Sequence, residues 1–133
     1  MAGRVTFTGA LPHDAVRAHL ATTEIFLQHS VTDRNGNTEG LPTAIQEAMA
    51  AGCIPVSTRH AGIPEAITEG ENGFMVAERD EDAFADRLAR LLDMPDRSAL
   101  ARAARATAET RFDNAVLLDR VEAQIRARVT ARR

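Results

Sequence analysis

Two glutamates that flank the predicted start of a helix are the strongest candidates for chemistry in this sequence. Glu39 precedes Gly40-Leu41-Pro42, and Glu47 follows about a turn and a half into the helix predicted for residues 42–51. Pro42 suits the first turn of a helix, because its fixed φ fits there and its missing N–H would have no partner. Gly52 then supplies the usual stop after the last turn.

The start of this helix is suited to an anionic ligand. The predicted N-cap residue, Leu41, has no side-chain oxygen, so the first backbone N–H groups remain for water or a ligand. Because a helix N-terminus carries a partial positive charge, phosphate binds well there. The carboxylates of Glu39 and Glu47 would instead accept hydrogen bonds from hydroxyl groups. A ligand with both phosphates and diols fits such a site, and a nucleotide sugar is such a ligand.

The elements around this helix predict an α/β fold, because short apolar strands alternate with helices along the chain. We expect a Rossmann-like parallel sheet of about four strands, at residues 4–8, 24–28, 54–57 and 74–76. Further helices are expected at residues 14–22 and 64–68, and after the capping aspartates Asp80, Asp96 and Asp113. The prediction is one partial domain over residues 1–133, with its core at 4–92 and a helical C-terminal extension at 96–130.

Composition excludes several classes of function. The net charge of −3 gives no reason to expect nucleic acid as a partner, and no apolar run is long enough for membrane insertion. The single cysteine, Cys53, excludes an intrachain disulfide and fits a cytoplasmic protein. The histidines lack the spacing of metal ligands, so no metal site is expected. All 16 basic residues are arginines, which excludes P-loop and Schiff-base chemistry because both need a lysine.

The segment EGLPTAIQEAMAAGCIPVS resembles the E-x7-E motif of retaining family 4 glycosyltransferases, which have the GT-B fold. Other similar pieces follow the family's order between about residues 4 and 92: Val5-Thr6-Phe7-Thr8-Gly9, Phe26-Leu27-Gln28-His29-Ser30, Gly62-Ile63-Pro64-Glu65 and Asn72-Gly73-Phe74. The resemblance implies a truncated GT-B C-terminal domain, the donor-binding part of an enzyme of polysaccharide biosynthesis. Such an enzyme transfers a glycosyl group from a nucleotide sugar, with retention, to an acceptor held by an absent N-terminal domain.

The resemblance also implies roles for single residues. Glu39 would be the catalytic residue at the donor sugar, and Glu47 would accept hydrogen bonds from the nucleotide ribose. The other donor-binding positions are Gly40 and Leu41 at the diphosphate, Ala10 and Leu11 at the base, and Thr43 and Ser30. We expect a UDP- or GDP-linked sugar as the ligand, and no cofactor.

Two loop residues have a functional and a structural interpretation. Arg34 could reach a phosphate or an acceptor, although such an arginine is more often a solvated loop charge. His29 could contact the ligand, but a buried, hydrogen-bonded histidine is the interpretation we favour.

The chain departs from the family pattern near its beginning. Full enzymes carry an Arg and a Lys early in the donor domain that neutralise the leaving diphosphate; here the Lys is absent and no Arg matches. Because such stabilisation is a large catalytic term, we expect this fragment to bind donor but to be inactive alone. Two missing strands would lie between the strands at Val5 and Ile25. We therefore expect the first strand either to re-pair within the chain or to form a homodimer, through the exposed sheet edge or a strand swap.

Two alternatives remain open from the sequence. One is a non-catalytic nucleotide-sugar-binding or interaction module, and the other is a GT-B-like epimerase or hydrolase that shares the sheet and the nucleotide site. For the full enzyme, a cytoplasmic location, peripheral at the inner face of the membrane, is the expectation.

Overall fold

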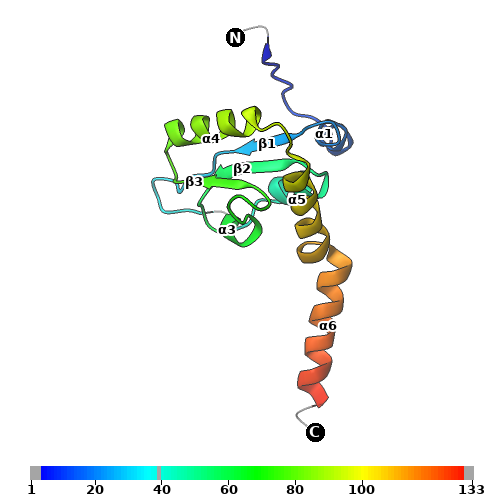
Figure 1. Ribbon diagram of the computed structural model, residues 1–133. Helices are drawn as coiled ribbons and strands as arrows, with labels where there is room; N and C mark the ends of the chain where they lie inside the picture. The colour runs from blue at the N-terminus through cyan, green and yellow to red at the C-terminus, as the bar shows by residue number, and fades with distance from the viewer. Residues whose placement is uncertain (1–3, 39, 131–133) are drawn as a thin grey trace.

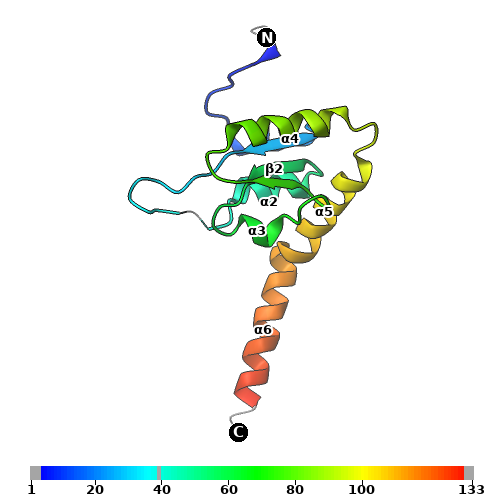
Figure 2. The ribbon, with the colours of Figure 1, turned by 60° about the vertical axis from the view of Figure 1, so that its left-hand side comes forward.

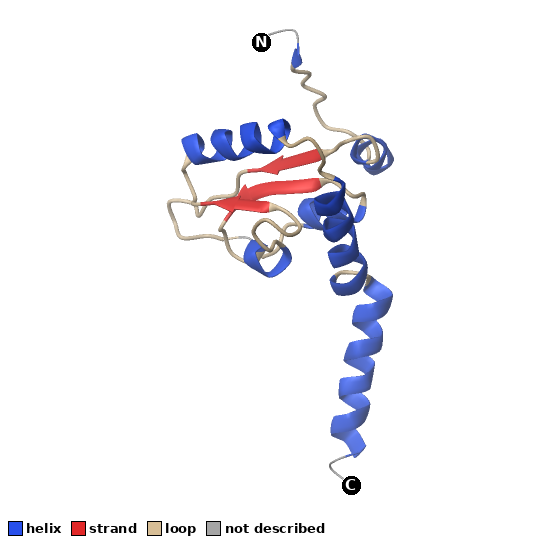
Figure 3. Cartoon of the chain, viewed as in Figure 1, coloured by secondary structure: helices blue, strands red, loops and turns tan. Residues whose placement is uncertain are grey.

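The computed structural model describes residues 4–38 and 40–130 of the 133-residue chain. Its sheet has three strands, β1 (Ile25–Gln28), β2 (Ile54–Thr58) and β3 (Phe74–Val76), all parallel and in the order β1-β2-β3. The helices are α1 (His13–Leu20), α2 (Thr43–Ala50), α3 (Ile63–Ala66), α4 (Glu81–Asp93), α5 (Ser98–Arg111) and α6 (Asn114–Thr130). Figure 3 shows the strands enclosed between helices, which confirms the predicted α/β class.

β2 is the central strand, and all of its residues are buried. Its register places Ile54 beside Ile25 of β1 and Val56 beside Phe74 of β3. A strand that is covered on both faces is typical of parallel sheets. Pro55, which cannot donate to a ladder, is the second residue of this strand and lies close to its start.

The core lies in two layers, one on each face of the sheet (Figures 1 and 2). On one face, the side chains of β2 and β3 pack against α4 and the start of α5; they are Ile54, Val56, Phe74, Leu91 and Leu100. On the other face, α2, α3 and α5 cover the sheet with a second cluster that includes Ile45, Met49, Ile63, Met75 and Ala104. The sheet is therefore held rigidly, and its strand ends can position a site.

α2 buries the face that its sequence predicts, with Ile45, Ala48 and Met49 turned inward. Cys53 follows the helix and is fully buried, with its Sγ 3.4 Å from the carbonyl oxygen of Leu20. Burial raises the pKa of the Cys53 thiol. This cysteine is therefore a small core residue.

The prediction of a strand at residues 4–8 is wrong. Residues 5–9 form no ladder and run away from the sheet toward the N-terminus (Figure 1), and the Phe7 side chain is 94% exposed. β-Branched and aromatic residues favour a strand only where a neighbouring strand offers partners. Within the described residues β1 pairs with β2 alone, so the sheet has three strands rather than about four.

The three C-terminal helices each follow an aspartate, and Asp80 caps α4 as predicted, whereas the N-cap residue of α5 is Arg97 and no side chain caps that helix. The carboxylates of Asp80, Asp96 and Asp113 accept hydrogen bonds from the backbone N–H groups of Ala83, Ser98 and Ala115, respectively. α6 projects away from the sheet (Figure 2), and its apolar side chains, including Leu118 and Ile125, are exposed rather than packed in the core. Arg126 pairs with Glu122 on this helix, as its spacing predicts.

Candidate functional site

A polar hollow of about 470 Å³ lies beyond the carboxyl ends of β1 and β2. It is lined by Gln28, His29, Ser30, Val31, Asp33, Asn37, Thr38 and His60. Open α/β sheets bind their ligands beyond this edge, because the loops there are free to carry polar groups while the strands below stay rigid. The predicted donor-binding residue Ser30 therefore lies where a ligand of this fold would bind.

Side chains of β2 hold the loop that follows β1. The Thr58 hydroxyl donates to the Ser30 carbonyl oxygen over 2.5 Å and accepts from the Ser30 backbone N–H over 3.1 Å. The Ser57 hydroxyl donates to the Gln28 carbonyl oxygen over 2.7 Å. Ser30 is thus fixed to the neighbouring strand at its backbone, while Gln28 Nε2 donates to its hydroxyl over 3.3 Å.

Farther along, the same loop closes on itself at residues 33–37. The Asp33 carboxylate accepts from the backbone N–H groups of Asn35 and Asn37, at 2.7 and 2.8 Å, and from the Asn37 amide. These bonds, led by the Asn37 backbone N–H, lower the pKa of Asp33. Arg34 lies in this exposed turn and does not line the hollow.

One cluster at this edge has no counterpart in the sequence prediction. The Glu78 carboxylate, just beyond β3, accepts from the Thr32 backbone N–H over 2.8 Å and from the Thr32 hydroxyl over 3.1 Å. Its Oε1 also lies 2.7 Å from Nδ1 of His60, a residue that is only 2% exposed. The Thr32 N–H, followed by the His60 bond, lowers the pKa of Glu78 to about 2. Glu78 is therefore ionised at neutral pH, and the His60 Nδ1–H donates to it.

The start of α2 leaves its first backbone N–H groups uncapped. The N-cap residue is Pro42, one position later than predicted, and no side chain caps the helix. Two hydrogen bonds hold the backbone that precedes α2. Gln46 Nε2 donates to the Leu41 carbonyl oxygen over 3.3 Å, and the Gly62 backbone N–H donates to the Gly40 carbonyl oxygen over 3.4 Å. The predicted diphosphate-binding segment is therefore a fixed backbone turn at a helix N-terminus.

Glu47 lies one helical turn after Thr43, so both side chains share a face of α2. The half-buried Glu47 lines a hollow of about 330 Å³ between α1 and α2, together with His13 and Arg17 of α1. The exposed Ala10 and Leu11 lead directly into α1. The structure thus brings Glu47 near the start of α1, whereas Ser30 and His29 line the separate hollow at the strand ends.

Glu39 and His29 are the remaining candidate residues. Glu39 lies outside the described residues, between Thr38, which lines the strand-end hollow, and Gly40. The expectation that His29 is buried and hydrogen-bonded is wrong, because His29 is exposed and its ring packs edge-on against Phe84, with centroids 5.5 Å apart. The buried histidine is His60, which the Glu78 carboxylate can hold.

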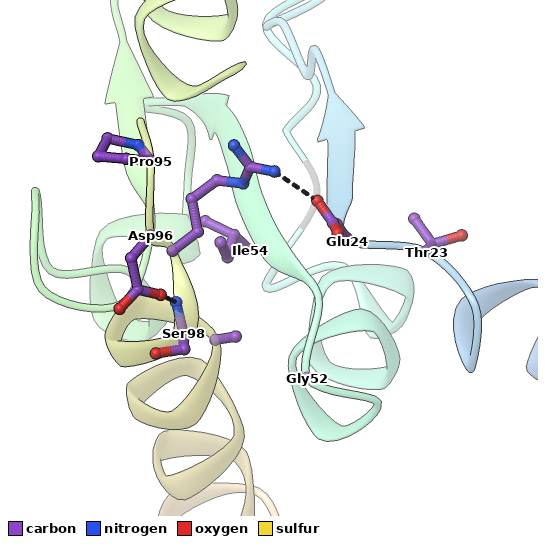
Figure 4. Close-up of a pocket in the computed structure, with 9 residues that line it drawn as sticks. Thr23, Glu24, Gly52, Ile54, Pro95, Asp96 and Ser98 are labelled. Atoms are coloured by element: carbon purple, nitrogen blue, oxygen red, sulfur yellow. Dashed lines mark hydrogen bonds and ion pairs between the residues drawn. The ribbon is translucent and has the colours of Figure 1, made fainter. Parts of the chain in front are cut away.

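Another hollow, of about 380 Å³, lies at the opposite, amino-terminal ends of β1 and β2 (Figure 4). There Arg97 pairs with Glu24 over 2.7 Å and donates to carbonyl oxygens at the end of α4, of which Met94 is the nearest at 2.9 Å. These bonds join the end of α4 to the start of β1, so the charged groups of this hollow are engaged in holding the fold.

No three His, Cys, Asp or Glu side chains within residues 4–38 and 40–130 are arranged to hold a metal ion. None of the helices that the structure describes has the length and apolar character needed to cross a membrane.

Comparison with known proteins identifies the family. The family model described as "Glycosyl transferases group 1" matches residues 1–109. WcaL of Escherichia coli K12, assigned as a colanic acid biosynthesis glycosyltransferase, is 39% identical over 115 residues, which is 85% of this chain and 28% of WcaL. The amylovoran biosynthesis glycosyltransferase AmsK of Erwinia amylovora is 39% identical over 110 residues, 82% of this chain and 27% of AmsK.

A third relative is the GDP-mannose-dependent alpha-(1-6)-phosphatidylinositol monomannoside mannosyltransferase of Mycobacterium tuberculosis H37Rv. It is 36% identical over 117 residues, which is 85% of this chain and 30% of that enzyme. The chain therefore spans less than a third of the length of each of these relatives.

Solved structures show the same fold. Sucrose-phosphate synthase of Thermosynechococcus elongatus matches 98% of this chain and 31% of its own, with a TM-score of 0.78 and 22% identity. Anabaena HepE in complex with UDP-glucose matches 84% of this chain and 30% of its own, with a TM-score of 0.72 and 21% identity. The family match over residues 1–109 shows that the chain belongs to the group 1 glycosyl transferases, and its parallel sheet with flanking helices has a GT-B-type fold.

Proposed function

We propose that this chain is the donor-binding part of a retaining, family 4 glycosyltransferase. The enzyme would transfer a hexosyl group from a nucleotide sugar to an acceptor held by a further domain. The observation that carries the proposal is the uncapped N-terminus of α2, with Glu47 on its surface, at the ligand-binding edge of a group 1 domain. The nucleotide would be UDP or GDP, in line with the UDP-glucose bound by HepE and the GDP-mannose dependence of the mycobacterial relative.

Each part of the nucleotide sugar is assigned to a group of the chain that can bind it. The backbone N–H groups of Gly40 and Leu41, at the positive end of α2, would bind the diphosphate, with the Thr43 hydroxyl close by. The Glu47 carboxylate would accept from the ribose hydroxyls, and Glu39 would act at the donor sugar. The backbone at Ala10 and Leu11 would meet the base. No metal is assigned a role, because helix dipole and backbone donors can supply the positive potential at the phosphates.

The isolated chain would bind donor without transferring its sugar. The resemblance implies an Arg and a Lys that neutralise the diphosphate as it leaves; this chain has no lysine, and none of its arginines matches the family's arginine. We further propose that the whole enzyme works in the cytoplasm, peripheral to the inner membrane face, in polysaccharide biosynthesis. The relatives named for colanic acid and amylovoran biosynthesis support the last point.

The chain would also form a homodimer. β1 is an edge strand among the described residues, and Val5 and Phe7 in the N-terminal segment are exposed. An open edge and an unpaired apolar segment can satisfy each other across two copies. Light scattering tests this proposal, and a monomer at high micromolar concentration would contradict it.

The function is tested by calorimetric titration of the chain with UDP, GDP, ADP and their sugar conjugates. We expect selective binding of one nucleotide series, and its loss in Glu47→Ala. Glu71→Ala is the control, because Glu71 is an exposed carboxylate on a turn remote in sequence from α2. Binding that is equal for all nucleotides, or that survives Glu47→Ala unchanged, would contradict the proposed site.

A further inference from the structure

Glu78 joins the loops that follow all three strands. It comes two residues after β3, it accepts two hydrogen bonds from Thr32 in the loop after β1, and it pairs with His60 in the loop after β2. These partners lie 46 and 18 residues away in the sequence. No other carboxylate within the described residues bonds both of these loops, and no role for Glu78 follows from the E-x7-E resemblance.

The bonds to Thr32 fix the loop that lines the strand-end hollow. Both the backbone N–H and the hydroxyl of Thr32 donate to the carboxylate, and Arg79 Nη2 donates to the Thr32 carbonyl oxygen over 2.5 Å. Hydrogen bonds to a charged acceptor are about twice as strong as neutral ones. Ordering the backbone between Val31 and Asp33 costs conformational entropy, and the hydrogen bonds from Thr32 to Glu78 offset this cost.

The bond from Glu78 to His60 fixes the loop that follows β2, and this loop contacts the backbone at the start of α2. Because ionised Glu78 can only accept, the proton of this hydrogen bond lies on Nδ1 of His60. His60 lines the strand-end hollow with Ser30, and its carbonyl oxygen accepts from the Ile63 N–H over 3.0 Å. Gly62, between these two residues, rests on the Gly40–Leu41 peptide that precedes α2.

We propose that Glu78 is a positioning residue of the donor site, which holds the loops after β1 and β2 in the arrangement that binds the nucleotide sugar. This rests on the proposed function of the chain. Glu78 acts through Thr32 and His60 and does not itself contact the ligand. Donor affinity therefore depends on a residue that lies outside the motif that predicts the site.

Glu78→Gln tests the proposal because it keeps the size of the side chain and removes its charge. The amide can still accept from the Thr32 N–H, but its NH₂ group then faces His60 Nδ1, which must become an acceptor. We expect the imidazole proton to move from Nδ1 to Nε2, as ¹⁵N spectra of His60 would show. We also expect backbone amide signals of Ser30, Thr32 and Gly40 to shift, and donor to bind about tenfold more weakly.

The matched control is Glu71→Gln, an exposed carboxylate that should change neither the spectra nor the affinity. The proposal is overturned if Glu78→Gln leaves the His60 tautomer and these amide signals in place, or if its affinity equals that of the control. Should the unsubstituted chain bind no nucleotide sugar, the proposed function fails. The spectra of the unliganded variants would still decide whether Glu78 sets the loops.

Discussion

Gly62→Ala should disturb the proposed diphosphate site without touching the ligand. A Cβ on Gly62 would lie 3.0 Å from the Leu41 nitrogen and 3.3 Å from the Gly40 carbonyl carbon. The Leu41 nitrogen belongs to the backbone N–H that is proposed to bind phosphate. Since carbon and nitrogen atoms prefer a separation of about 3.5 Å, the peptide must move by about 0.5 Å.

The cost to stability is expected to be small. Gly62 has φ −80° and ψ −2°, which alanine adopts without strain. Alanine also lowers the entropy of the unfolded chain, which contributes about 0.5 kcal/mol of stability. Crowding of this kind costs about 1–3 kcal/mol, so the net loss should be about 1 kcal/mol. Binding should suffer more, because a shift of this size in a positioned donor weakens donor affinity by about tenfold.

Urea unfolding and calorimetric titration measure the two effects on the same variant. Gly40→Ala is the control for the steric argument, because a Cβ on Gly40 would meet nothing within 4 Å. Its free energy of unfolding should match or exceed that of the native chain. The reasoning is refuted if Gly62→Ala binds donor as tightly as the native chain and leaves the amide signals of Gly40 and Leu41 unmoved.

Three further predictions concern stability. Gly73→Ala should cost about 3 kcal/mol in urea unfolding, because its Cβ would lie 2.7 Å from the Pro55 carbonyl oxygen inside the core; a loss below 1 kcal/mol would show that the sheet yields easily there. Asn72→Ala should cost about 3 kcal/mol, because the buried amide donates to Ala66 O and Thr107 Oγ1 and accepts from the Thr68 N–H; an unchanged midpoint would refute this. Glu78 has a folded pKa of about 2 against an ordinary 4.5, so its stabilisation is full above pH 4.5 and is lost as the pH falls toward 2. The free energy of unfolding should therefore fall less steeply between pH 4.5 and 2 for Glu78→Gln than for the native chain. Equal slopes would contradict the low pKa of Glu78.

Elements with a strong local pattern could be predicted from the sequence. The helix after Pro42 has an apolar face and a glycine stop, and the strand at Ile54 is short, apolar and bounded by turns, so local preference and burial agree there. The segment at Val5 has the same composition as a strand but finds no partner in the described chain. A strand depends on its neighbour, and composition cannot supply one.

The candidate site divides in the same way. Its helix start could be predicted, because the residues that make it are adjacent in sequence. The identity of the buried histidine could not be predicted, since the partner of His60 is a carboxylate 18 residues away and the partner of Thr32 is the same group 46 residues away. His29 follows a strand and favours a buried interpretation, yet the end of β1 lies at the sheet edge and leaves it exposed.

The central claim is that the donor binds at the carboxyl edge of the sheet, against the start of α2. Two-dimensional ¹⁵N–¹H spectra of the chain, recorded during titration with UDP-glucose and GDP-mannose, test it most directly. The account predicts saturable shifts in the amides of Gly40, Leu41, Thr43 and Glu47. Shifts confined to the opposite edge, around Glu24 and Ser98, or no shifts with either ligand, would contradict it.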